Sequence, residues 1–211
     1  HPAVLHVEPA DRREPQPAQA ADVAIPGQPT GASILCLSCH DGTIALGEVL
    51  SSSTQIDMSG GVTTMPAGPD RHGTDLSDDH PISFAYTATL ASQRGELVNP
   101  STLTGAVRLD ASGQLQCTTC HNAHDDTNGK FLVMANTRSA LCQTCHVKNY
   151  WSTSAHNTSN ASWNGVAPDP WPNSTLTTVS ANACQNCHKP HAAGGRHLLA
   201  RGAAAVQPAP L

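Results

Sequence analysis

Hydrophobic and polar residues follow one another along this chain without a sustained helical or alternating period. Glycine and proline number 16 each among 211 residues, and together with many Ser, Thr, Asn and Asp residues they divide the sequence into short segments. This pattern predicts a mostly irregular fold of loops with short α-helices and little β-structure. Helices are expected from Cys36 to about Leu50, from near Thr137, whose hydroxyl can cap a helix before Cys142, and from Ser180.

All eight cysteines lie in four CxxCH pentapeptides. In such a motif two thioethers attach a c-type haem, and the histidine that follows becomes an axial ligand of the iron. CxxC pairs also form redox disulfides or parts of zinc sites, but neither chemistry requires a histidine directly after the second cysteine. The sequence therefore predicts four haem c groups.

Each residue of the four motifs has a predicted role. The expected thioether cysteines are Cys36, Cys39, Cys117, Cys120, Cys142, Cys145, Cys184 and Cys187. The expected proximal iron ligands are His40, His121, His146 and His188. The second and third motifs are the closest in sequence, so they are expected to form one haem-binding unit. No tandem repeat is evident beyond the motifs themselves.

The composition provides too few large side chains to fill a core of ordinary size. Aromatic residues make up only 3% of the chain, so four porphyrins are expected to supply the missing apolar bulk. The polypeptide is therefore predicted to wrap around a four-haem array. We expect an extended Ala- and Pro-rich arm over residues 1–30, a tetrahaem cytochrome domain over 31–198 and a C-terminal tail over 199–211.

Charge and hydropathy limit the partners and the location. The net charge is −5 and the 11 Lys and Arg residues form no run, which argues against nucleic acid. No apolar stretch approaches the roughly 20 residues that span a bilayer. The chain begins at His1 without a methionine or a hydrophobic leader, as a secreted chain does after signal cleavage. An exported protein is expected.

Six-coordinate irons need four further axial ligands, and eight histidines remain to supply them. His124 and His191 each follow a proximal histidine by three residues, so they cannot reach the opposite face of the same porphyrin. Each is expected to ligate a different, adjacent haem. The three methionines are too few to serve all four irons.

The remaining histidines are harder to assign from local sequence. His80 precedes Pro81, which favours extended backbone, and His156 lies in a polar segment. For both, an iron ligand and a surface histidine are equally open interpretations. His72 and His197 are expected to be solvated.

Several segments resemble the doubled-CxxCH multihaem cytochromes. They are Cys36–Thr43, Asp78–Tyr86, Cys117–His124, Leu141–His146, Trp151–Ser159 and Cys184–Gly195. Within this family, the arrangement resembles the tetrahaem subunits of extracellular cytochrome filaments, often called nanowires. The resemblance implies bis-histidine haems with His80, His124, His156 and His191 as distal ligands, and a head-to-tail homopolymer. In such filaments a neighbouring subunit can donate a ligand, a role that His1 and His6 on the arm keep open.

Electron transfer is the function that these features predict. An iron with histidine on both faces has no open position for a substrate, so no enzymatic activity is expected. Redox partner proteins or extracellular electron acceptors would exchange electrons with the chain, at the cell surface or outside the cell. The alternatives are a monomeric periplasmic tetrahaem carrier and, less favoured, a multihaem reductase, which needs a five-coordinate iron.

Overall fold

The structure, a computed structural model, describes residues 26–44, 46–48, 51–166, 169, 171, 174–194 and 198–200. Most of the predicted N-terminal arm, and the predicted tail beyond Ala200, lie outside these residues. The same holds for His1, His6 and His197.

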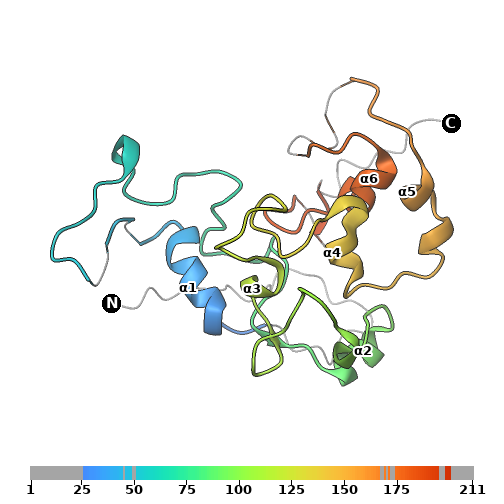
Figure 1. The fold of residues 1–211 in the computed structure, drawn as a ribbon, viewed down its shortest axis with the longest axis horizontal. Helices are drawn as coiled ribbons and strands as arrows, with labels where there is room; N and C mark the ends of the chain where they lie inside the picture. The colour runs from blue at the N-terminus through green and yellow to red at the C-terminus, as the bar shows by residue number, and fades with distance from the viewer. Residues whose placement is uncertain are drawn as a thin grey trace.

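Short helices joined by long loops form the fold, which confirms the predicted class (Figure 1). The α-helices are α1 (Gly31–His40), α2 (Ala88–Arg94), α3 (Cys117–Cys120), α4 (Ala140–Gln143), α5 (Ala155–Thr158) and α6 (Val179–Asn182). The 3-10 helices are η1 (Ser59–Gly61), η2 (Pro100–Thr102), η3 (Thr137–Ser139), η4 (Trp151–Thr153) and η5 (Ala183–Asn186). Among the described residues, none of these helices is long and apolar enough to cross a bilayer.

The β-structure of the described residues is small. Strand β1 (Phe84–Ala85) pairs antiparallel with β2 (Gln114–Leu115), and Phe84 lies opposite Leu115. Tyr86, which follows β1, is buried and donates its hydroxyl to the carbonyl of Val98 at 2.6 Å. The sheet therefore holds together the segment between the first two haem motifs.

Helix α1 differs from its predicted range, Cys36 to about Leu50. It begins at Gly31 and ends at His40. Asp41 stops it, because its carboxylate accepts the backbone N–H and the hydroxyl of Thr43 instead of allowing another helical turn. Gly42 follows with φ +77°, a left-handed conformation that glycine adopts without strain.

The two other predicted helices exist, but with different caps. Thr137 opens the 3-10 turn η3, and Asn136 rather than Thr137 accepts a backbone N–H, from Leu141. Helix α6 is capped by Thr178, whose hydroxyl accepts from Ala181. Ser180 is instead buried inside that helix. The side chain that caps lies one or two residues before the predicted one, because both stretches contain several residues that can cap a helix.

The protein itself buries little apolar surface. Its buried apolar side chains are Leu37, Tyr86, Ala91, Val107, Leu115, Trp171, Ala183 and Ala193 among the described residues. Large apolar side chains are exposed beside the haem motifs: Leu35 is 74% exposed before Cys36, and Val147 is 50% exposed after His146. The arrangement fits a chain whose core includes porphyrins.

The chain contains two structurally equivalent units, which the sequence analysis did not find. In the first, the hydroxyl of Ser33 on α1 accepts the backbone N–H of Cys117 at 3.0 Å. In the second, the hydroxyl of Ser139 accepts the backbone N–H of Cys184 at the same distance. Both serines are fully buried and both precede a CxxCH motif by three residues. Each unit thus joins an odd-numbered motif to the next even-numbered one.

The even-numbered motifs also share the loop that follows them. Asn122 donates its backbone N–H to Phe131 and Val133 donates to Cys120; in the second unit, Lys189 donates to Leu198 and Ala200 to Cys187. His121 pairs with Leu132, and His188 pairs with Leu199, in antiparallel bridges. The fourth motif is therefore tied to the chain as far as Ala200, two residues beyond the predicted domain boundary at 198.

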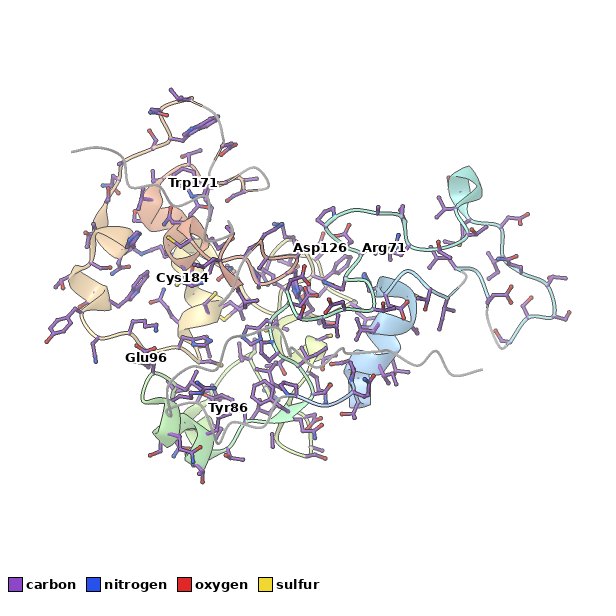
Figure 2. All side chains as sticks on the ribbon, turned by 180° about the vertical axis from the view of Figure 1, so that it is seen from behind. Arg71, Tyr86, Glu96, Asp126, Trp171 and Cys184 are labelled. Carbon is purple, nitrogen blue, oxygen red and sulfur yellow. The ribbon has the colours of Figure 1, made fainter. Side chains whose placement is uncertain are left out.

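The two units occupy different regions of the molecule. Helices α4, α5 and α6 group together in yellow to red, while α1 and α3 lie side by side near the blue and green part of the chain (Figure 1). A long loop, drawn in cyan, extends away from α1, and its residues 51–61 are all exposed. Trp171 is buried near Cys184 (Figure 2) and donates its indole N–H to Asn186 at 2.9 Å.

Replacing Ser33 with Ala is expected to destabilise the first unit. The substitution leaves the Cys117 N–H without its acceptor, whereas the side-chain oxygen of Gln116 loses the Ser33 hydroxyl but keeps that of Ser83. Unsatisfied buried groups of this kind cost about 1–3 kcal/mol each, so the free energy of unfolding of the holoprotein should fall by about that amount. Guanidinium denaturation followed by circular dichroism measures the change.

Ser38→Ala is the matched control, because the Ser38 hydroxyl donates to the Leu35 carbonyl and the Cys39 sulfur of its own helix. Equal loss of stability in the two variants would contradict a special role for Ser33.

Candidate haem-binding site

Cysteine side chains of successive motifs interact with each other, in the order of the motifs along the sequence. All eight cysteines are free of disulfides. Cys36 is hydrogen-bonded to Cys117, Cys120 interacts electrostatically with Cys145, and Cys142 is hydrogen-bonded to Cys184. The first motif therefore adjoins the second, the second the third, and the third the fourth. The predicted pairing of the second and third motifs is one of three such links.

Burial and mutual contact shift the pKa values of these thiols. Burial raises the pKa of Cys120 to about 11. The hydrogen bond between Cys142 and Cys184 raises the pKa of the first thiol and lowers that of the second to about 6. Cys184 (Figure 2) is thus the described thiol with the strongest thiolate character.

Three pairs of histidine rings face each other at one common separation. A metal–imidazole bond is about 2 Å long, so two rings that ligate one iron from opposite sides have centroids about 6 Å apart. The observed centroid distances are 6.0 Å for His40 and His72, 6.2 Å for His121 and His191, and 6.3 Å for His80 and His146. Each pair joins the histidine of one CxxCH motif to a histidine from elsewhere in the chain. The spacing fits a bis-histidine iron.

Five of these six rings are held through Nδ1. The Nδ1 atom of His40 lies 2.7 Å from the Asp70 carbonyl, that of His121 lies 3.0 Å from the Lys130 carbonyl, and that of His80 lies 2.9 Å from the Pro81 carbonyl. A carbonyl oxygen only accepts, so Nδ1 carries the proton. The Nε2 lone pair is then left for a metal, which is the usual arrangement of a histidine ligand.

Burial keeps several of these imidazoles in the ligand form. It lowers the pKa of His80, His121 and His146. A neutral imidazole is the form that binds a metal. Burial is the largest cause, and neighbouring groups such as Lys148 beside His146 lower the pKa further, so neutral histidines are favoured at the second and third motifs.

His72, which the sequence analysis took for a solvated residue, belongs to this site. Its backbone N–H donates to the carbonyl of His40 at 2.8 Å, so the long loop between the two histidines begins and ends at the same place. The local sequence Arg71-His72-Gly73 carries no sign of this position. Only the closure of the loop brings His72 opposite His40.

His191 reaches the first unit through a backbone exchange. Pro190 accepts the backbone N–H of His80 at 2.7 Å, and Ala193 donates to Asp78 at 3.0 Å. The segment after the fourth motif therefore lies along residues 78–80. This places His191 opposite His121, which belongs to a different motif from the one that His191 follows.

Asp79 lies between two of the non-motif histidines. Its side chain is 6% exposed, and its Oδ1 atom lies 2.9 Å from Nδ1 of His191 and 3.2 Å from Nδ1 of His72. Burial acts to raise the pKa of Asp79, but the hydrogen bonds from the two histidines outweigh it and lower the pKa to about 2. The carboxylate is therefore ionised at neutral pH.

His124 and His156, two of the four distal ligands implied by the resemblance, are placed differently from the paired histidines. Both are exposed. Within the described part of the chain, no second histidine ring lies against either of them. His156 lies on α5, which packs against α6 and η5 near Cys184. The described part of the chain does not bring these two histidines into a facing pair.

The comparison with known families agrees with this site. Residues 111–149 match the family model described as the doubled CXXCH motif. The match covers the second and third motifs and supports a multihaem c-type cytochrome. Its CXXCH motifs indicate covalently bound haem c. No curated protein matches the chain.

Proposed function

We propose that this protein transfers electrons through four covalently bound haem c groups, each with histidine on both faces of the iron. The observation that carries the proposal is the common 6.0–6.3 Å separation of three facing histidine pairs. When bound, haem c supplies an iron that exchanges one electron. The chain supplies the thiols that attach each haem and the imidazoles that hold each iron.

The proposed distal ligands are His72 for the first haem, His191 for the second and His80 for the third. His72 is an addition to the set implied by the resemblance. Facing imidazoles would close both axial positions of these three irons, which favours electron exchange over substrate binding. The proposed function is therefore that of an electron carrier and not of a reductase.

The proposed electron path follows the order of the motifs in the sequence. Two thiol hydrogen bonds, Cys36 with Cys117 and Cys142 with Cys184, and the electrostatic interaction of Cys120 with Cys145 support it. Thioether bonds fix each porphyrin to its cysteines, so adjoining cysteines require adjoining porphyrins. Electrons would enter at one end of this row and leave at the other.

His124 supports a head-to-tail polymer. It occupies the same place in the first unit as His191 in the second, three residues after a proximal histidine, and the two units share their backbone hydrogen bonds. His191 faces the even-numbered motif of the preceding unit. By the same relation, exposed His124 would face the fourth motif of a neighbouring copy. A repeated contact of this kind that does not close into a ring gives an open filament.

We accordingly propose that the chain is a subunit of an extracellular cytochrome filament. A monomeric periplasmic carrier is the alternative, in which His156 on α5 takes the place of His124 within one chain. Its position against the helices around Cys184 is the observation that favours this alternative.

The oxidised protein is expected to contain four haems per chain, all of them low-spin. Mass spectrometry of the purified holoprotein and a pyridine haemochrome assay give the stoichiometry, and electron paramagnetic resonance gives the spin state. Fewer than four haems, or a large high-spin signal that shifts on adding nitrite or cyanide, would favour a reductase instead.

His72→Ala is expected to convert one low-spin haem per chain to high spin, because the first iron loses its second imidazole. Arg71→Ala is the control, since it changes the adjacent exposed residue and should leave all four haems low-spin. Magnetic circular dichroism of the two variants measures the difference. If His72→Ala keeps four low-spin haems, His72 is a solvated residue after all.

His124→Ala is expected to abolish filaments and to leave a soluble chain with one haem lacking its second histidine. His156→Ala should leave both the filaments and the spin state unchanged. Negative-stain electron microscopy and haem spectroscopy of the two variants are the measurements. The reverse outcome, with His156→Ala releasing one iron and no filaments in the parent protein, would support the monomeric carrier.

A further inference from the structure

One buried carboxylate oxygen contacts two histidines that serve different irons. Oδ1 of Asp79 accepts from His191 at 2.9 Å and from His72 at 3.2 Å, and the Ala192 backbone N–H lies 3.3 Å away. The two imidazole rings themselves are in contact, with centroids 4.5 Å apart. Oδ2 of Asp79 is also buried and has no hydrogen-bond partner.

These contacts connect two of the facing pairs. His72 faces His40 of the first motif, and His191 faces His121 of the second. Both rings use Nδ1 toward Asp79, so both direct Nε2 away from it. Asp79 therefore lies behind two proposed distal ligands at once: it shares the loop between η1 and β1 with His72, whereas His191 comes from the segment after the fourth motif.

We propose that Asp79 is a shared positioning residue that orients the distal histidines of the first and second haems and lowers the reduction potentials of both. This inference rests on the proposed function. A carboxylate that accepts the Nδ1 proton of a ligating imidazole makes that imidazole a stronger donor to the metal. A stronger donor and a nearby negative charge both stabilise the ferric state, so the two effects act in the same direction.

The third haem offers an internal comparison. Its proposed distal ligand, His80, is the residue directly after Asp79, yet its Nδ1 donates to the Pro81 carbonyl at 2.9 Å. A neutral carbonyl is a weaker acceptor than a carboxylate. Residues 79–81 thus hold three proposed distal ligands, two through the Asp79 carboxylate and one through the Pro81 carbonyl.

The experiment compares Asp79→Asn with Asp78→Asn in the holoprotein. The first substitution keeps the shape of the buried side chain and removes its charge. The second removes the same charge one residue earlier, from a side chain that makes no hydrogen bond to a histidine among the described residues. Redox titrations followed by nuclear magnetic resonance of the haem methyl groups resolve the four haems separately.

Asp79→Asn is expected to raise the midpoint potentials of two haems, those of the first and second motifs, and to leave that of the third nearly unchanged. Asp78→Asn should produce a smaller change. Equal changes in the two variants, or a change at one haem only, would overturn the shared role. Asp79→Ala, which also removes both hydrogen bonds, should add a high-spin fraction at the same two haems.

Two other results are distinguishable from these. His72, Asp79 and His191 also form a donor group that can hold a metal ion. One equivalent of zinc per chain in the parent protein, lost in Asp79→Asn, would overturn the proposal in favour of a metal site. Parent protein without low-spin haems at the first and second motifs would refute the proposed function itself, before either variant is compared.

Discussion

Two imidazoles that ligate one iron must face each other with their ring centres about 6 Å apart, and each CxxCH motif supplies only one of them. The second imidazole has to come from another part of the chain and be held there. His72 arrives through a closed loop whose backbone N–H meets the carbonyl of His40. His191 arrives through a segment that binds residues 78–80. Much of the irregular backbone positions these second histidines.

The small protein core follows from the same constraint. Few apolar side chains are buried among the described residues, and Leu35 and Val147 stay exposed beside haem motifs. Polar groups fix the motifs instead, through the buried hydroxyls of Ser33 and Ser139. Because a buried hydrogen bond is directional and costly to lose, a few such bonds position the cysteines where apolar packing is sparse.

Asp79 and His80 lie where the two units meet. The His80 backbone binds the segment that carries His191. The Asp79 side chain contacts the histidines that face the first and second motifs, and the His80 ring faces the third motif. A change at this point would therefore affect several haems together. The relation between the units also gives exposed His124 a counterpart in His191, which links the internal repeat to the proposed assembly of copies.

The haem motifs could be predicted from the sequence, because thioether attachment and proximal ligation involve residues at fixed spacing. The loop-rich class could also be predicted, from the many turn-forming residues and few aromatic ones. The tertiary structure alone decided which histidines face each other, since His72 and His40 meet only when a long loop closes. It likewise revealed the repeat, whose similarity lies in backbone hydrogen bonds around Ser33 and Ser139. Local sequence cannot encode such contacts because their partners lie far along the chain.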